Sequence, residues 1–259
     1  MKFICGLCVI EGSELAFDTA KELKDLIKGY DVDFYFKASF DKANRTSESS
    51  FRGIGFAEGL ETLRKIKTDL GVKILTDVHT VNQAKIIGCH HKWIDCIQIP
   101  AFLCRQTDLV KAIAKTGAIV NIKKGQFLAP DDIRHIIEKV KSTGNDKIML
   151  TERGTCFGYH NLVVDYRSFL IMKKYGYPVI FDCTHSQQRP SEGNESGGSR
   201  EFSIPMAMGA IACGADGIFA ETHYYPPIAK SDKATSLYLR DIPELLHKTT
   251  IIEKAIKNG

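Results

Sequence analysis

Short apolar segments alternate with amphipathic segments along the whole chain. The apolar segments have the length and the β-branched and aromatic content of buried strands, which we expect at 3–10, 32–39, 72–79, 93–100, 118–124, 147–154, 178–185 and 217–223. The segments between them repeat apolar residues at helical spacing, and we expect helices at 14–28, 58–70, 80–88, 106–117, 130–144, 163–176, 204–214 and 242–259. Many of these helices end in glycine just before the next strand, which is a typical helix stop.

Eight consecutive strand–helix units without a linker predict a single-domain (β/α)8 TIM barrel over residues 1–259. The alternative is an open, doubly wound α/β sheet. That fold usually carries a glycine-rich phosphate loop after its first strand, and the segment "CVIEGSEL" is a poor match to one. The polar, glycine-rich segment 186–203 lies between the seventh strand and its helix, where a barrel carries an active-site loop.

Composition limits the binding partners and the cellular compartment that we expect for the protein. The net charge of +4 is too small to indicate nucleic acid, but it suits a site for anionic small molecules. The eight cysteines lie mostly in apolar runs, as reduced core cysteines of a cytoplasmic protein do. The N-terminal run "MKFICGLCVIEGSE" is short and meets Glu11 at once, so we interpret it as the first strand rather than a signal peptide. No apolar run is long enough to cross a membrane, and we expect no membrane partner.

All eight expected strands end in polar or ionisable side chains. The carboxyl ends of barrel strands share one face, where burying such groups is costly unless they bind a ligand. We therefore expect the active site at this rim. The strand-end residues are Cys8, Lys37, Asp77, His79, Gln98, Lys123, Glu152, Arg153, His185, Glu221 and His223.

Side chains two positions apart on a strand share a face. At several strand ends this alternation indicates which of two adjacent side chains points into the barrel. Asn121 and Lys123 should face inward, because Ile122 between them is apolar and suits the layer of helices. Lys124 shares the outward direction of Ile122 and is expected to be solvated. The other pairs expected to share a face are Asp77 with His79 and Cys183 with His185.

The rim residues fall into two chemical groups. One group consists of cations suited to phosphate and carboxylate oxygens: Lys37, Lys42, Arg45, Lys123 and Arg153. The other group, Cys8, His185, Glu221 and Asp232, offers a thiolate, an imidazole and two carboxylates. Such a set suits Zn²⁺, Fe²⁺ or Mn²⁺ better than Mg²⁺, although an ordinary core cysteine is the alternative at position 8. A redox pair of Cys5 and Cys8 is not expected, because residues three apart on a strand face opposite ways.

Eight segments together resemble one enzyme family, in the same order and over nearly the whole chain. They are "FKASFDKANRTS", "TDVH", "IQIPAFLCRQTDLV", "NIKKGQF", "TERGTCFGYHNLVVD", "VIFDCTHS", "SGGSRE" and "AETH". The family they resemble is the 3-deoxy-D-manno-octulosonate-8-phosphate synthases. The resemblance implies a cytoplasmic, homotetrameric (β/α)8 transferase of lipopolysaccharide (Kdo) biosynthesis. Such an enzyme condenses phosphoenolpyruvate with D-arabinose 5-phosphate and water, and releases phosphate.

The resemblance also implies roles for single residues. Phosphoenolpyruvate would contact Lys37, Ser39, Lys42, Lys123, Gln126, Arg153 and His185. Arabinose 5-phosphate would contact Asn44, Arg45, Thr46, Asp77 and Ser196, together with Arg105 of a neighbouring subunit. Catalytic roles would fall to Lys37, Lys42, Lys123, His185 and Asp232.

The family has a metal-dependent branch and a metal-independent branch, which carries asparagine at the position of the first metal ligand. Cys8 stands at that position here, and the remaining ligands would be His185, Glu221 and Asp232. The resemblance therefore implies a bound divalent metal. Two departures from the family pattern are Leu7, where proline is usual, and the segment "KSDKATSLY", which matches its region loosely.

Three other functions are compatible with parts of this pattern. The related 3-deoxy-heptulosonate-7-phosphate synthases use erythrose 4-phosphate, but their loop has a Lys-Pro-Arg-Thr core where residues 42–47 read Lys-Ala-Asn-Arg-Thr-Ser. A Schiff-base aldolase would use Lys37 or Lys123 as its nucleophile. A sugar-phosphate-binding barrel without catalysis would not need the complete set of rim residues.

Overall fold

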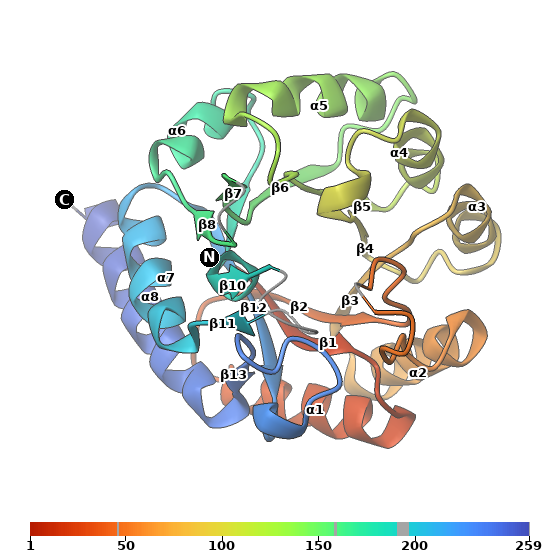
Figure 1. Cartoon of the computed structure of the whole chain (residues 1–259), viewed down its shortest axis with the longest axis horizontal. Helices are drawn as coiled ribbons and strands as arrows, with labels where there is room; N and C mark the ends of the chain where they lie inside the picture. The colour runs from red at the N-terminus through yellow and green to blue at the C-terminus, as the bar shows by residue number, and fades with distance from the viewer. Residues whose placement is uncertain (46, 158–159, 191–196, 259) are drawn as a thin grey trace.

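Eight parallel strands close into a barrel in the computed structural model of the chain, which describes residues 1–45, 47–157, 160–190 and 197–258 (Figure 1). Neighbouring strands pair in parallel, and pairing between the first and the last closes the barrel. The predicted TIM barrel is therefore confirmed, and the open-sheet alternative is wrong. The strands are β1 (Lys2–Val9), β2 (Asp33–Ser39), β3 (Lys73–Asp77), β4 (Cys96–Ile99), β5 (Ile119–Lys123), β6 (Ile148–Glu152), β9 (Val179–Asp182) and β12 (Gly217–His223).

Helices surround the barrel, one after each strand (Figure 1). They are α1 (Ser13–Leu26), α2 (Phe56–Leu70), α3 (Val81–His90), α4 (Thr107–Ala114), α5 (Ile133–Lys141), α6 (Arg167–Lys173), α7 (Ser203–Ala212) and α8 (Ile242–Asn258). The helix predicted at 163–176 starts too early, because Val163 pairs with Thr155 in a short hairpin instead. In the part of the chain that the structure describes, no helix combines the length and the apolar character that a membrane span requires.

Five short strands extend the loops that follow the barrel strands. The strands β7 (Thr155–Cys156) and β8 (Leu162–Val163) pair as one antiparallel hairpin after β6. The expected active-site loop at 186–203 contains a second antiparallel pair, β10 (Gln188–Arg189) with β11 (Gly197–Gly198). The fifth, β13 (Leu237–Tyr238), pairs in parallel with the end of β12. These additions all build up the carboxyl-end face of the barrel.

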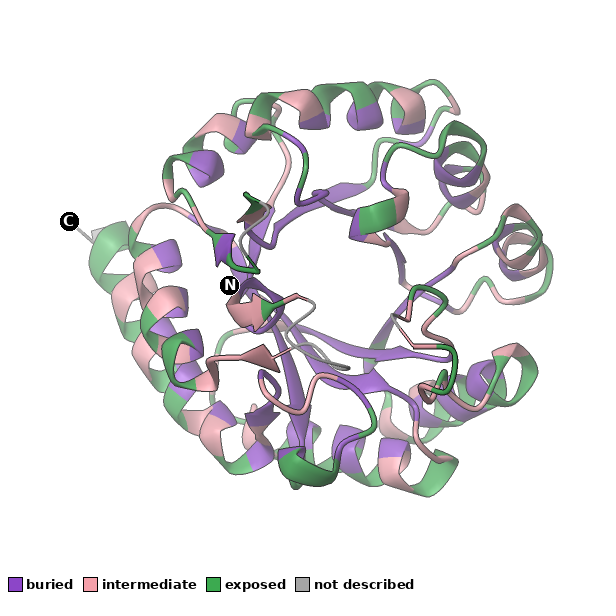
Figure 2. Ribbon diagram, viewed as in Figure 1, coloured by how far each residue is buried: buried purple, intermediate pink, exposed green. Residues whose placement is uncertain are grey.

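The apolar core has two parts. The larger part lies between the barrel and the buried faces of the helices, while the outer helix faces are exposed (Figure 2). The smaller part fills the barrel interior with Ile4, Tyr35, Leu75, Cys96, Met149, Ile180 and Phe219. Most of these residues lie near the start of their strands, so the interior is closed at the amino end and the carboxyl end is left for polar groups.

The N-terminal run forms β1, as expected, and contains a bulge that sets the direction of Cys8. The pairing of β1 with β2 shifts register between Leu7 and Val9, so that Cys8 is the extra residue. Bulges of this kind re-aim a side chain and are common next to active sites. Cys5 packs in the outer core, which agrees with the prediction that Cys5 and Cys8 face opposite ways.

The cysteines only partly follow the expectation of buried thiols. Five of them, Cys5, Cys8, Cys96, Cys104 and Cys183, are buried, whereas Cys89 and Cys156 are exposed.

Candidate active site

A cleft of about 300 Å³ lies at the carboxyl ends of the barrel strands. Polar side chains from the strand ends and the loops after them line it, as the sequence predicts. The predicted residues that line the cleft are Lys37, Lys42, Asn44, Arg45, Asp77, His79, Gln98, Lys123, Gln126, Arg153, His185 and Asp232.

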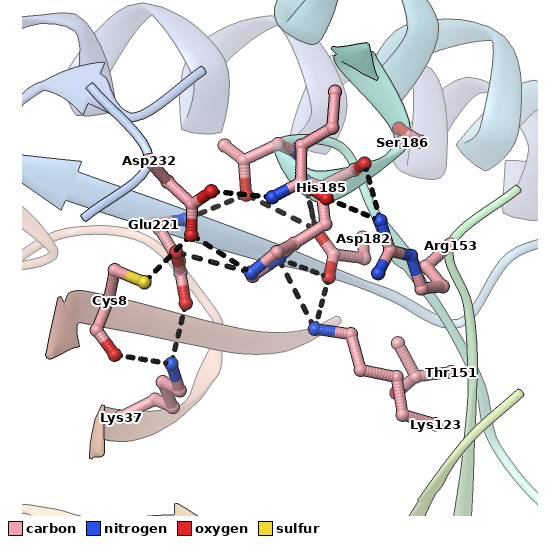
Figure 3. A network of polar contacts seen from close by, with 12 residues as sticks. Cys8, Lys37, Lys123, Thr151, Arg153, Asp182, His185, Ser186, Glu221 and Asp232 are labelled. Atoms are coloured by element: carbon pink, nitrogen blue, oxygen red, sulfur yellow. Dashed lines mark hydrogen bonds and ion pairs between the residues drawn. The ribbon is translucent and has the colours of Figure 1, made fainter. Parts of the chain in front are cut away.

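Four predicted metal ligands converge beside this cleft. Cys8 comes from the β1 bulge, Glu221 from β12, Asp232 from the loop after β12, and His185 from the turn after β9. One ligand atom from each lies within 4.8 Å of the other three. Figure 3 shows the four side chains pointing toward one another.

The geometry of the four residues fits a divalent transition-metal ion. Cys8 Sγ lies 2.8 Å from Asp232 Oδ2, and His185 Nε2 lies 3.3 Å from Glu221 Oε2. Glu221 Oε2 is buried and has no hydrogen-bond partner among the described residues. A buried carboxylate oxygen without a donor is costly, and a cation at the centre of the cluster would satisfy it. Sulfur, nitrogen and carboxylate donors together suit Zn²⁺ or Fe²⁺.

The protonation states of the cluster residues also favour the binding of a cation. Burial, together with the nearby charges of Asp232 and Glu221, raises the pKa of the Cys8 thiol well above its usual value. Burial opposes the ionisation of Glu221, but the positive charges of His185 and Lys37 outweigh it and lower the pKa of that carboxyl. The apo cluster therefore holds a neutral thiol beside ionised carboxylates, and a bound cation would take the place of the thiol proton.

Asp182, at the end of β9, orients His185 from behind. Its carboxylate is fully buried and lies 2.7 Å from His185 Nδ1 and 2.6 Å from Lys123 Nζ (Figure 3). It also accepts hydrogen bonds from the backbone N–H groups of Thr184 and His185. Burial opposes its ionisation, but the positive charges of His185 and Lys123 hold the pKa of Asp182 well below its usual value. With Nδ1 donating to Asp182, His185 Nε2 is left to face the cluster.

We expect Asp182→Asn to weaken metal binding by about 10- to 100-fold, because the partner that fixes the ring and tautomer of a metal-ligating histidine is lost. Metal content after dialysis against a graded chelator series measures this effect. Asp25→Asn, which removes an exposed carboxylate on α1, is the matched control and should bind metal normally. Unchanged metal retention in Asp182→Asn would show that Asp182 does not orient His185.

Two lysines connect the candidate metal cluster to the cleft. Lys37 Nζ lies 2.5 Å from Glu221 Oε1, with both side chains 1% exposed, and donates to the carbonyl oxygen of Cys8 at 3.1 Å. Lys123 Nζ lies 4.4 Å from the centre of the Phe219 ring. Burial lowers the pKa of Lys123, while the charge of Asp182 opposes that shift. Both ammonium groups lie beside the cluster, and the cleft around them favours an anionic ligand.

The loop after β2 folds over the other side of the cleft. Arg45 donates to Ser231 Oγ at 2.8 Å and to the carbonyl oxygen of Phe51 at 3.0 Å, which ties this loop to the one that carries Asp232. Lys42 donates to Ser39 Oγ at 3.0 Å. The run of cations after β2 is therefore part of the cleft wall rather than a solvated turn.

Asp77 and His79 share a face, as expected. Both line the cleft, and Asp77 Oδ2 lies 3.8 Å from His79 Nε2. The other carboxylate oxygen, Asp77 Oδ1, is buried without a hydrogen-bond partner among the described residues. It is available to accept from a hydroxyl group of a ligand in the cleft.

Four of the substrate contacts that the family resemblance implies are not part of the described cleft wall. Ser39 is fully buried beneath Lys42 and is absent from the lining. Arg105 is exposed outside the cleft, and its carbonyl oxygen accepts a hydrogen bond from Lys139. Thr46 and Ser196 lie outside the described residues.

Two predictions from strand alternation are wrong. Lys124 is fully buried rather than solvated, because Nζ lies 3.4 Å from Glu152 Oε1 and donates to two carbonyl oxygens, those of Gly125 and Leu128. Cys183 packs in the outer core while His185 reaches the cleft, because β9 ends at Asp182 and the chain then turns.

Two further rim residues have local partners instead of a place in the cleft. Glu152 accepts from the backbone N–H groups of Arg153 and Gly154. His223 Nδ1 accepts from the backbone N–H of Tyr225, and its Nε2 lies 3.6 Å from Glu11 Oε1.

Sequence reasoning missed several residues of the site, among them Asp182, Gln188 and Ser231. A signal existed for Asp182, since a charged residue inside the apolar strand "VIFDCTH" requires a buried partner. Gln188 lies in the two-residue strand β10 and Ser231 lies in the loop after β12, and no periodic sequence pattern indicates the direction of either side chain.

Comparison with known proteins shows the family of the chain. Residues 1–258 match the DAHP synthetase I family. A protein of Geotalea uraniireducens is 51% identical over 255 residues, which cover 98% of this chain and 93% of the relative. A protein of Trichlorobacter lovleyi is 49% identical with the same coverage of both chains. A protein of Desulfatibacillum aliphaticivorans is 49% identical over 97% of this chain and 92% of its own length. All three are named 2-dehydro-3-deoxyphosphooctonate aldolase.

Proposed function

The chain belongs to the DAHP synthetase I family and, within it, to the 2-dehydro-3-deoxyphosphooctonate aldolases, and we propose from this the reaction that it catalyses. It is a transferase of Kdo biosynthesis. It condenses phosphoenolpyruvate with D-arabinose 5-phosphate and water to give 3-deoxy-D-manno-octulosonate 8-phosphate and phosphate. The observation that carries the proposal is the cation-lined cleft directly beside a Cys–His–Glu–Asp cluster at the barrel mouth.

The two substrates occupy different ends of the cleft. Lys123, Gln126 and Arg153 bind the carboxylate and phosphate of phosphoenolpyruvate, with Lys37, Lys42 and His185 completing that end. Asn44, Arg45 and Asp77 bind the pentose phosphate, together with Thr46, Ser196 and a neighbouring subunit's Arg105. Fixed cations hold two anions that would otherwise repel each other, so that carbon 3 of phosphoenolpyruvate lies against the aldehyde carbon.

The proposed reaction forms and breaks bonds in a way that requires proton transfers, which ionisable groups of the cleft can assist. A carbon–carbon bond forms between carbon 3 and the aldehyde carbon, water adds at carbon 2, and the carbon 2–phosphate bond breaks to release inorganic phosphate. The attacking water loses two protons, one as it adds and one as the carbon 2 hydroxyl becomes the ketone. The aldehyde oxygen takes up one of them, and the departing phosphate takes up the other. We assign Lys42 to holding one of these protons, because its side chain lines the cleft. His185 is not assigned to proton transfer, because its Nδ1 is engaged by Asp182 and its Nε2 faces the candidate metal cluster.

A divalent ion completes the site. Cys8, His185, Glu221 and Asp232 are the residues that would hold Zn²⁺, Fe²⁺ or Mn²⁺. When bound, such an ion supplies a Lewis acid that polarises an oxygen of a substrate or of water.

The family resemblance supports a proposal for the oligomeric state and the cellular compartment. We propose a cytoplasmic homotetramer. The exposed position of Arg105, outside the cleft of its own chain, supports a contact with the cleft of a neighbouring subunit.

A Schiff-base mechanism is the alternative function that one observation favours. Burial lowers the pKa of Lys123, as in lysines that attack carbonyl groups. Lys123 is nevertheless held by Asp182 at 2.6 Å, which keeps the ammonium form in place. Borohydride added together with the substrates would leave the protein mass unchanged under our proposal, and a trapped adduct on Lys123 would support the rival.

We expect Arg45→Ala to weaken arabinose 5-phosphate binding by about 1.5–3 kcal/mol, the free energy of a charge-assisted hydrogen bond. The KM for the pentose phosphate should rise, while the KM for phosphoenolpyruvate should change little. Arg52→Ala is the control, because Arg52 lies in the same loop, pairs with Asp41 and does not line the cleft. A larger loss for phosphoenolpyruvate than for the pentose would mean that the two ends of the cleft are assigned in reverse.

A further inference from the structure

Gln188 lies between Arg153, a proposed contact of phosphoenolpyruvate, and Asp232, a candidate metal ligand. It is the first residue of β10, directly after the turn that carries His185, and its side chain lines the cleft. Its Oε1 accepts from Arg153 Nη2 at 2.6 Å, and its Nε2 donates to Asp232 Oδ1 at 2.5 Å. One neutral amide thus connects a cation for phosphoenolpyruvate with a candidate metal ligand.

The side chains of Asp232 and Arg153 depend on contacts with other residues for their orientation. Asp232 has a backbone φ of 49°, which is unusual for a residue with a side chain and persists only where surrounding contacts hold it. Its second oxygen, Oδ2, lies in the metal cluster against Cys8. Arg153 is 5% exposed, and its Nε has no hydrogen-bond partner among the described residues, which leaves that N–H for an anion.

A glutamine fits this position better than other side chains of its size. It offers a donor to a carboxylate and an acceptor to a guanidinium at the same time. It adds no charge, so it competes neither with the metal for Asp232 nor with the phosphate for Arg153. A glutamate would repel Asp232, and an apolar side chain would leave both charged groups without this partner.

We propose, building on the proposed function, that Gln188 is a positioning residue for both halves of the reaction. Its amide turns Asp232 Oδ2 toward the metal and Arg153 toward phosphoenolpyruvate. One substitution at this position should therefore weaken metal binding and phosphoenolpyruvate binding together.

Gln188→Met tests this, because methionine is unbranched and of similar length but cannot replace either hydrogen bond. Co²⁺ is titrated into metal-free protein and followed by its absorption, in which the thiolate band reports Cys8 and the ligand-field bands report the whole donor set. Phosphoenolpyruvate binding is measured by calorimetry on metal-free protein, so that the two contacts are read separately. The control is Gln187→Met, whose side chain donates to Ser186 Oγ at 3.0 Å and to no other group among the described residues.

We expect Gln188→Met to lose about tenfold or more in Co²⁺ affinity, in the range seen when a partner of a metal ligand is removed. The ligand-field bands should change while the Cys8 thiolate band remains. Phosphoenolpyruvate affinity should fall by about tenfold as well, since a hydrogen bond to a charged group is lost. Gln187→Met should match the wild type in all three readouts.

Other results would overturn the inference. Loss of phosphoenolpyruvate binding with normal Co²⁺ binding would make Gln188 a direct substrate ligand rather than a positioning residue. Normal binding of both by Gln188→Met, beside a wild type that binds both, would overturn the inference alone. A wild type that binds neither would overturn the proposed function, and the inference with it.

Discussion

Removal of the metal should abolish phosphate release, and Cys8→Ala should lose metal and turnover together. The Cys8 thiolate would be the strong soft ligand of a bound metal, and without it one imidazole and two carboxylates remain. The barrel should stay folded, because the Cys8 side chain faces the cluster and lies outside the two parts of the apolar core. Metal content, phosphate release and the unfolding temperature of the variant measure the three expectations.

Two further variants separate the role of Cys8 from that of cysteines in general. Cys5→Ala, in the same strand but in the outer core, should keep its metal and its turnover. Cys8→Asn copies the metal-independent branch of the family that the sequence resembles. We expect it to lose the metal and to keep measurable turnover without it, because the amide still offers a neutral oxygen to the site. Full activity of metal-free wild-type protein would contradict the role given to the cluster.

The barrel was predictable because its signals are local and repeated. Each strand is a short apolar run and each helix has an apolar stripe, so errors at single boundaries do not change the architecture. The helix expected at 163–176 shows the limit of such signals. Val163 continues an apolar pattern that suits a helix, but the structure uses it in a hairpin with Thr155, a choice made by tertiary pairing.

The candidate site was predictable where a strand end fixes direction, and not beyond that point. Lys37, Asp77 and Lys123 lie in the cleft because the barrel places all carboxyl ends on one face. Alternation failed for Cys183, because β9 ends one residue before it. It also failed for Lys124, whose ion pair with Glu152 depends on a residue of another strand. Gln188 and Ser231 reach the site through loop conformation, which no periodicity encodes.

Arabinose 5-phosphate should support phosphate release at least about 100-fold better than erythrose 4-phosphate, in terms of kcat/KM. With the phosphate held at Arg45, the aldehyde of a four-carbon sugar stops one carbon short of phosphoenolpyruvate. A misplacement of about 1 Å can cost about 100-fold in rate. Asn44, which lines the cleft one position before Arg45, is also placed to hold a hydroxyl group that the shorter sugar lacks.

Phosphate release from phosphoenolpyruvate, measured with each of the two aldose phosphates in turn on the metal-loaded wild type, tests the central claim most directly. The account predicts rapid release with arabinose 5-phosphate, slow release with erythrose 4-phosphate, and none without an aldose. Equal release with both sugars, or faster release with erythrose 4-phosphate, would contradict it.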